Sequence, residues 1–205
     1  IEVYRPNENK TLSFKLTRAK IEIDNVSYKN LGNGIYKIDI VQFLDNSIEE
    51  FNNSWDLVVN DVNKNNDLKG IIVDLRNNPG GYVSSVKHVL EEFLKDDKTM
   101  FFEETNSTGK IAFKDNRKGK LEDTPIIVLV NEGSASASEI FATAIQDNNR
   151  GKVVGLPTVG KGVEQQVITD LPDKSLLVMV FQRWLTPLGR NLTKENPVSP
   201  DFKIE

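Results

Sequence analysis

Three serines stand close together in the segment Ser134-Ala135-Ser136-Ala137-Ser138. The segment follows the apolar run 125–130 and a short turn, where a strand would end and a helix would begin. A serine placed there would lie beside the unpaired N–H groups and the positive dipole of the helix start, which can stabilise the oxyanion of acyl transfer. Ser136 and Glu139 also fit a capping box, and most such serines only cap a helix. The spacing alone leaves both roles open for Ser136.

A serine nucleophile needs a base, and the composition restricts the choice. The chain has no cysteine and one histidine, which excludes thiol proteases, cysteine zinc sites and histidine-rich metal sites. At helical spacing His88 points toward Ser84, Glu91 and Glu92, away from the apolar stripe, so we expect it on a solvated face and not in catalysis. The remaining bases for serine are a carboxylate or a lysine that burial keeps neutral.

Lys161 is the lysine with the most unusual neighbours, because Gly160 and Gly162 flank it. Glycines would let the backbone of another element approach closely, although most lysines lie in solvated turns. The segment 155–161 also fits the G-x-x-x-x-G-K pattern of a phosphate-binding loop. That pattern then requires Ser or Thr where Gly162 stands, and a helix where the residues alternate like a strand. We therefore expect no nucleotide and no other cofactor.

A second chemistry-bearing turn is Asp74-Leu75-Arg76-Asn77-Asn78-Pro79-Gly80-Gly81, at the end of the apolar run 71–75. Ligands of open α/β sheets bind where the strands end. The alternative is that Gly80 and Gly81 have only a structural role, as a tight turn.

Strands and helices alternate along the chain. We expect a hairpin over 1–16, an extended segment at 21–23, strands at 35–40, 71–75, 125–130, 153–155 and 176–181, and helices that begin at Ser47, after Gly81 and near Ser136. The segment 96–120 is polar, with short strand-like interruptions. This order predicts an α/β fold with crossover connections and a mainly parallel sheet. The run 71–75 shows no alternation, which is typical of a sheet covered on both faces.

The composition favours one soluble domain, or one domain with a fragment of another: the chain has 205 residues, 38% of them hydrophobic and 27% charged. A net charge of -4 makes it no match for nucleic acid or anionic lipid. No apolar run approaches the ~20 residues of a membrane span. The start at Ile1 indicates a piece cut from a longer precursor.

Four segments together resemble the carboxyl-terminal processing proteases, also called tail-specific proteases, over nearly the whole chain. Residues 74–81 resemble the family's D-L-R-x-N-x-G-G block, and residues 130–140 resemble its nucleophile block. Residues 159–165 resemble its F-G-K-G-x-x-Q block with Val159 in place of the aromatic residue, and residues 185–190 resemble its T-P-x-G-R segment. Four blocks in this order are far more specific than any one alone.

The resemblance implies a serine endopeptidase with a Ser-Lys dyad on a crotonase-like (ClpP-like) core of mainly parallel strands with crossover helices. It assigns the nucleophile to Ser136, the base to Lys161, the orienting helper to Gln165, and the oxyanion hole to the N–H groups of Ala137 and of Gly81 or Gly80. Ser134 and Ser138 would be small packing or capping residues. Strand alternation would send Glu164 to the face opposite Gln165.

The resemblance also implies a division of the chain and a setting. Residues 1–20 would be the remnant end of a PDZ domain and a linking strand, and residues 21–205 the peptidase core. The partners would be protein or peptide substrates in extended form, cleaved near their C-termini outside the cytoplasm, with no metal or nucleic acid and with homo-oligomers allowed. The segment 197–201 departs from the family's G-I-x-P-D pattern.

Two rival functions belong to other classes. A catalytically silent scaffold would use the same fold only to bind peptide tails, and the intact Ser136, Lys161 and Gln165 argue against it. An acyl-CoA enzyme on the related crotonase core would not require a Ser-Lys pair at this spacing. The sequence therefore favours the peptidase.

Overall fold

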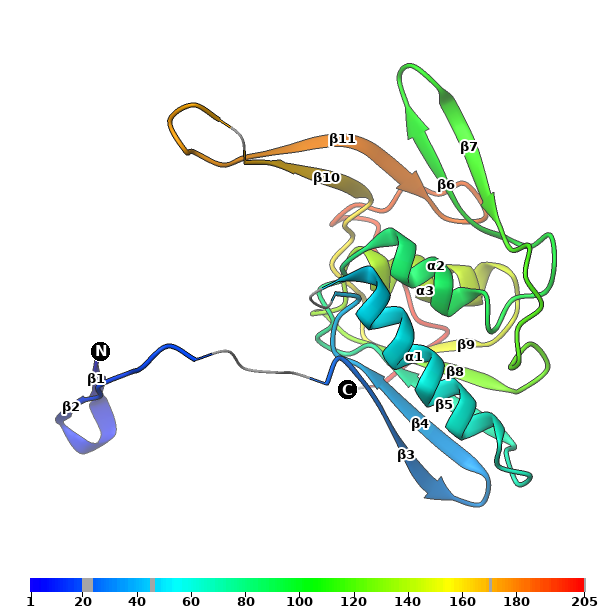
Figure 1. Ribbon diagram of the computed structural model, residues 1–205, viewed down its shortest axis with the longest axis horizontal. Helices are drawn as coiled ribbons and strands as arrows, with labels where there is room; N and C mark the ends of the chain where they lie inside the picture. The colour runs from blue at the N-terminus through cyan, green and yellow to red at the C-terminus, as the bar shows by residue number, and fades with distance from the viewer. Residues whose placement is uncertain (20–23, 45–46, 170, 205) are drawn as a thin grey trace.

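The strands form three separate sheets in the computed structural model, which describes residues 1–19, 24–44, 47–169 and 171–204 (Figure 1). The largest has the strand order β12-β9-β8-β5-β4-β3. Its strands are β3 (Val26–Gly32), β4 (Ile35–Ile40), β5 (Gly70–Asp74), β8 (Ile126–Val130), β9 (Lys152–Gly155) and β12 (Phe202–Lys203). All neighbouring pairs are parallel except β3 with β4. The predicted mainly parallel α/β sheet is confirmed.

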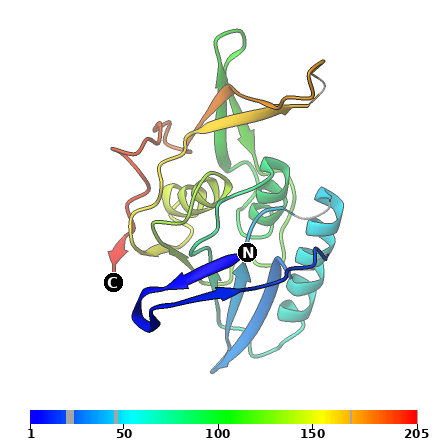
Figure 2. The same ribbon diagram turned by 90° about the vertical axis from the view of Figure 1, so that its left-hand side faces the viewer.

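Three α-helices of the described chain pack between the six-stranded sheet and a second, four-stranded sheet (Figures 1 and 2). They are α1 (Ile48–Asn63), α2 (Val83–Leu90) and α3 (Ala137–Asp147). Ser47 caps α1 as predicted, since its side chain accepts the Glu50 N–H at 3.1 Å. The helices meet through a chain of rings, because Phe93 lies 6.0 Å from Trp55 and 5.8 Å from Phe141 between centroids.

The helices of the described chain cover only one face of the six-stranded sheet, so the prediction of a sheet covered on both faces is wrong. The inward residues Val73 and Val128 are fully buried, whereas Ile127 on the other face is 41% exposed. The sequence of β8 is apolar throughout, but its exposure alternates. Successive side chains of a strand point to opposite faces, and the helices lie on one side only.

The four-stranded sheet is wholly antiparallel and has the order β10-β11-β6-β7. Its strands are β6 (Thr99–Thr105), β7 (Gly109–Lys114), β10 (Val163–Ile168) and β11 (Leu177–Leu185). The short strand-like pieces expected within 96–120 are therefore a full hairpin. β10 and β11 project from the body as an arm, here called the β10–β11 arm (Figure 1). The predicted apolar strand 176–181 lies in this arm and is exposed, not in the core.

The first strands, β1 (Glu2–Arg5) and β2 (Lys10–Ser13), form the predicted hairpin around the short helix η1 (Pro6–Glu8). They make a two-stranded sheet that joins neither of the other sheets. The extended segment predicted at 21–23 lies outside the described residues. Strands β3 and β12 were not predicted, because β3 is rich in polar residues and β12 is only two residues long.

Candidate active site

Ser136 occupies a sharp turn between β8 and α3. It is the N-cap of α3 and has φ 55° and ψ -115°. A positive φ at a residue other than glycine costs about 1–3 kcal/mol and persists only where the surroundings impose it. The Ser136 N–H donates to Glu139 Oε2 at 2.9 Å, so Glu139 supplies the carboxylate half of the predicted capping box. This strained turn presents the Ser136 side chain to a cavity.

The two neighbouring serines have structural roles, as predicted. Ser134 and Ser138 are fully buried. Ser134 Oγ donates to the Leu75 carbonyl at 2.7 Å, and Ser138 Oγ donates to the Asn78 carbonyl at 3.0 Å. Both bonds tie the Ser136 turn to the turn that follows β5. Only the middle serine of the three lines the cavity.

Gly80 and Gly81 bring the turn after β5 against Ser136. A Cβ atom on Gly80 would lie 2.8 Å from Ser136 Cβ and 3.0 Å from Ala137 N. A Cβ on Gly81 would collide with the backbone of Phe43, and both glycines have positive φ. The two glycines therefore do more than turn the chain, because no side chain fits at either position.

The N–H groups of these residues differ in their availability. Gly80 N donates to Asn78 Oδ1 at 2.8 Å. Within the described part of the chain, Gly81 N and Ala137 N donate to no acceptor. Of the two glycines proposed for an oxyanion hole, Gly81 is therefore the one whose N–H is left for a ligand, and Gly80 instead provides room for Ser136.

Lys161 reaches the same cavity from the segment between β9 and β10. As predicted, its flanking glycines admit another backbone, since a Cβ on Gly160 would collide with the Thr193 carbonyl and one on Gly162 with that of Leu192. Trp184 Nε1 donates to the Lys161 carbonyl at 3.0 Å. The Lys161 residue is half-buried. Among the described residues no hydrogen bond joins Ser136 Oγ to Lys161 Nζ.

The cavity has a volume of about 480 Å³ and lies where the two larger sheets meet. Ser136 comes from the turn between β8 and α3, whereas Gln165, which is exposed, comes from β10. The sequence analysis missed most of the wall, which consists of apolar side chains from α2 and the β10–β11 arm. These are Val83, Val163, Val167, Val178 and Phe181, joined by Tyr82 before α2. No local pattern distinguishes them from core residues.

Glu164 also lines this cavity, contrary to the expectation that strand alternation would turn it away from Gln165. The β10–β11 pairing shifts register between these two residues, so the regular alternation is broken. Burial raises the pKa of Glu164, and the charge of Glu103 adds to the increase, while a hydrogen bond from Gln182 opposes it. Glu164 Oε1 is buried and has no hydrogen-bond partner among the described residues.

His88 lies outside the Ser136 cavity, as predicted, and its Nε2 is 2.7 Å from Asp56 Oδ1 on α1. The expectation of a solvated face is wrong for Glu92, whose side chain is 1% exposed. Glu92 contacts Arg117 Nη2 at 3.0 Å and accepts the Lys120 N–H at 2.8 Å. The segment that follows β7 folds over this face of α2, which helical periodicity cannot reveal.

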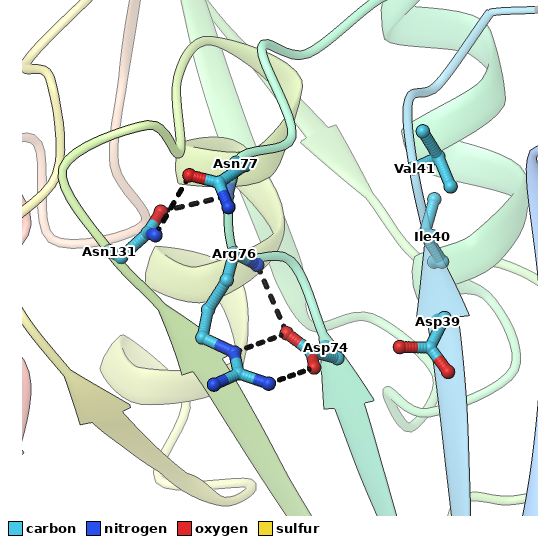
Figure 3. Close-up of a pocket in the computed structure, with 7 residues that line it drawn as sticks. All are labelled: Asp39, Ile40, Val41, Asp74, Arg76, Asn77 and Asn131. Carbon is cyan, nitrogen blue, oxygen red and sulfur yellow. Dashed lines mark hydrogen bonds and ion pairs between the residues drawn. The ribbon is translucent and has the colours of Figure 1, made fainter. Parts of the chain in front are cut away.

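Asp74 and Arg76 line a different cavity, at the carboxyl end of β4 and β5 (Figure 3). Arg76 binds Asp74 with both ends of its guanidinium, at 2.9 and 2.6 Å. Burial alone would raise the pKa of Asp74, but the hydrogen bonds and charge of Arg76 lower it. Next to this pair, Asn131 Oδ1 accepts the Asn77 N–H at 2.7 Å and Asn131 Nδ2 donates to Asn77 Oδ1 at 2.9 Å. The amide pair joins the turns after β5 and β8.

The Thr186-to-Arg190 block is structural. Gly189 N donates to the Thr186 carbonyl at 2.7 Å, and Arg190 Nη2 binds Asp147 Oδ1 at 2.7 Å. The block thereby anchors the last residue of α3. It also leads directly into residues 192 and 193, which pack on the glycines beside Lys161.

The described residues contain no group of three or more histidine, aspartate or glutamate side chains that could hold a metal ion. None of the helices they form is long and apolar enough to cross a membrane.

Comparison with known proteins places these features in a family. Residues 35–204 match peptidase family S41. A probable CtpA-like serine protease of Staphylococcus haemolyticus is 35% identical over 192 residues, covering 93% of this chain and 37% of the relative. Its counterpart in Staphylococcus aureus strain COL is 34% identical over 209 residues, covering 100% of this chain and 40% of the relative. The chain thus spans well under half the length of these relatives.

Solved structures show the same fold. The photosystem II D1 C-terminal processing protease superposes with a TM-score of 0.77 at 28% identity, over 97% of this chain and 53% of its own. A putative S41 protease from Bacteroides fragilis gives a TM-score of 0.71 at 12% identity, over 92% of this chain and 52% of its own. The mixed α/β architecture is therefore that of S41 peptidase structures.

Proposed function

Because the chain belongs to peptidase family S41, we propose that it is the catalytic part of a serine endopeptidase that uses a Ser136–Lys161 dyad. The observation that carries this proposal is the cavity at the junction of the two larger sheets. Ser136, Lys161 and Gln165 come from separate segments and line this one cavity. The half-exposed turn at Ser136 resembles the strained strand-to-helix turns that present nucleophilic serines.

The proposed reaction is acyl transfer to serine. The neutral amine of Lys161 takes the proton from Ser136 Oγ as the oxygen attacks the scissile carbonyl carbon. The tetrahedral intermediate then breaks its C–N bond, and Lys161 returns the proton to the leaving amine. Lys161 then takes a proton from water as the water oxygen attacks the acyl carbon, the ester C–O bond breaks, and Lys161 returns the proton to Ser136 Oγ. Gln165 carries no charge and can orient the amine without stabilising its protonated form.

The oxyanion would be held by the N–H groups of Gly81 and Ala137. Both N–H groups lack an acceptor within the described chain. The glycine turn lies against the start of α3, since a Cβ added at Gly80 would be 2.8 Å from Ser136 Cβ and 3.0 Å from Ala137 N. Ala137 is the first residue of α3, so the helix dipole adds to the stabilisation of negative charge. Donors of this kind typically contribute about 3–4 kcal/mol each.

The proposed substrate is an extended protein or peptide segment cleaved near its C-terminus. β10 is an edge strand of the four-stranded sheet, and an extended peptide can add to such an edge through main-chain hydrogen bonds. The apolar wall of the cavity would then take apolar side chains of the peptide. One structural relative, the photosystem II D1 C-terminal processing protease, is named for cleavage of this kind.

We extend the proposal to the setting of this core. The six-stranded sheet with its crossover helices would be a crotonase-like (ClpP-like) core, and β1 with β2 would be the last strands of a PDZ domain. The protein would act outside the cytoplasm, and homo-oligomers are compatible with this arrangement. Family resemblance supports each of these statements. The assignment of β1 and β2 to a PDZ domain is also supported by their forming a sheet of their own.

Labelling with a fluorophosphonate, which reacts with activated serines, tests the proposal. The wild-type chain should be labelled, and its Ser136→Ala and Lys161→Ala forms should not. Equal labelling of wild type and Ser136→Ala would reject the nucleophile. Absent labelling of a folded wild type would favour the silent scaffold. Peptides with free and amidated C-termini would then test C-terminal specificity.

A further inference from the structure

Glu139 is a fully buried carboxylate that lies between the segments carrying the two proposed catalytic residues. Its Oε2 accepts the backbone N–H of Ser136 at 2.9 Å and the backbone N–H of Lys161 at 2.8 Å. Its Oε1 accepts Gly160 N at 2.7 Å and Thr158 Oγ1 at 2.5 Å. One side chain thus binds the Ser136 turn and three residues of the Lys161 segment.

We propose that Glu139 is a positioning residue that fixes the Lys161 backbone relative to the Ser136 turn; this rests on the proposed function. Because one oxygen accepts both N–H groups, the backbone nitrogens of the two residues are held within two hydrogen-bond lengths of each other. A backbone bond from Val159 N to the Ser134 carbonyl, at 3.0 Å, also joins the two segments, but it involves neither Ser136 nor Lys161. Ser136 follows the parallel strand β8, and Lys161 precedes β10 of the antiparallel sheet.

A helix cap alone does not account for this arrangement. A capping box needs only the bond from Glu139 to the Ser136 N–H. The three bonds to residues 158–161 add nothing to the start of α3, yet they use the remaining acceptor capacity of the carboxylate, which has about four lone-pair sites. Hydrogen bonds to an ionised acceptor are roughly twice as strong as neutral ones. The carboxylate is therefore arranged to join two segments.

The geometry predicts what a glutamine at this position would do. Glu139→Gln keeps the size of the side chain but replaces one acceptor oxygen with an NH₂ donor. In one orientation the NH₂ faces the N–H groups of Ser136 and Lys161, and in the other it faces that of Gly160. Each orientation sets donor against donor, so the Lys161 segment must shift. A misplacement of about 1 Å at a catalytic group typically costs about a hundredfold in rate.

Thr158→Val is the matched control. It removes one hydrogen bond to the same carboxylate but leaves the bonds from Ser136, Gly160 and Lys161 in place. It also leaves Val198 N without the Thr158 Oγ1 acceptor that lies 3.0 Å away. We therefore expect Thr158→Val to lower the melting temperature while turnover stays within about twofold. Glu139→Gln should lower kcat about a hundredfold with little change in KM.

The experiment measures kcat, KM and melting temperature for wild type and both variants, together with amide hydrogen exchange in the wild type. If the backbone amides of Ser136 and Lys161 exchange at rates set by the same opening reaction, the inference is supported. Unrelated exchange rates for the two amides overturn it. This measurement needs only the wild type, so it decides the matter even if Glu139→Gln does not fold. Loss of activity in proportion to loss of stability across both variants also overturns it. A wild type that fluorophosphonate does not label would instead reject the peptidase proposal, and the paired exchange rates would still decide the role of Glu139.

Discussion

The six-stranded sheet and the β10–β11 arm carry similarly apolar strands in different surroundings. β8 reads Ile-Ile-Val-Leu-Val, and β11 begins Leu-Val-Met-Val-Phe. Val128 and Val130 of β8 are fully buried beneath the helices, whereas Val178 and Val180 of β11 are 47% and 56% exposed. Apolar strands therefore hold the first sheet together, whereas in the arm the same residue types remain available to a ligand.

The proposed catalytic residues lie where these two regions meet. Ser136 is fixed by the buried turns after β5 and β8, and Lys161 leads into β10 of the arm. The rigid region would supply the nucleophile and the oxyanion donors, and the exposed region would supply the base and the contacts for substrate. Changes in the two regions should therefore separate stability from activity.

The largest effect is expected from Lys161→Ala. Loss of a general base costs about 10²–10⁴-fold in rate, while Lys161 forms no ion pair within the described residues and so contributes little to stability. Labelling rates and melting temperature measure the two effects. Lys152→Ala is the control, since that exposed lysine forms a surface ion pair with Asp201, at 3.1 Å. A Lys161→Ala variant with near-normal turnover would remove Lys161 from the mechanism.

Phe141→Ala should have the next largest effect, in the rigid region. Phe141 is fully buried and packs edge-on against Phe93, so its truncation should lower the free energy of unfolding by about 3–5 kcal/mol. Phe181→Ala, in the arm, removes a side chain that is 47% exposed and should cost less than about 0.5 kcal/mol. Urea unfolding measures the free energy of unfolding of both variants. Similar losses of stability would mean that Phe181 is packed against the rest of the protein in solution.

A pH-dependent effect is expected at Asp115, which follows the β6–β7 hairpin. Burial raises the pKa of Asp115 to about 6, backbone N–H groups oppose the increase, and the charges of Glu91 and Asp96 add to it. The native state therefore holds this proton more tightly than the unfolded chain, and the stability it contributes is lost as pH rises from about 4 through 6.

Asp115→Asn should remove that dependence, because the amide cannot ionise. Between pH 4 and pH 7 the wild type should lose of order 1–2 kcal/mol more than the variant in the free energy of unfolding. Unfolding at several pH values measures the difference. Parallel stability curves for the two proteins would show that Asp115 does not titrate between these limits.

The smallest effect concerns two neighbouring residues of the arm. Val178 and Met179 are 47% and 46% exposed, but only Val178 lines the Ser136 cavity. Val178→Ser should lower kcat/KM about tenfold on peptides with apolar side chains, and Met179→Ser should leave it within about twofold. Neither should change the melting temperature much. Equal effects on kcat/KM would show that the cavity wall does not select the peptide.

Parts of the fold and of this site could be predicted from local sequence. The Ser47 cap, the start of α3 at Ala137 and the need for glycine beside Lys161 depend on hydrogen bonds and backbone geometry within a few residues. The four sequence blocks pointed to the Ser136 turn and the Lys161 segment, and the structure brings both to one cavity. The Ser-Lys chemistry itself stays a prediction.

Other features were decided only by the tertiary structure, because they depend on contacts between residues far apart in the chain. Periodicity could not show that helices cover only one face of the sheet, that a loop buries Glu92, or that a register shift brings Glu164 into the cavity. The sequence by itself determined most strands of the six-stranded sheet, the Ser47 cap and the reactive residue types. Only the fold decided which apolar strands are buried and placed the Glu139 carboxylate between Ser136 and Lys161, because burial and hydrogen-bond partners depend on how distant segments pack.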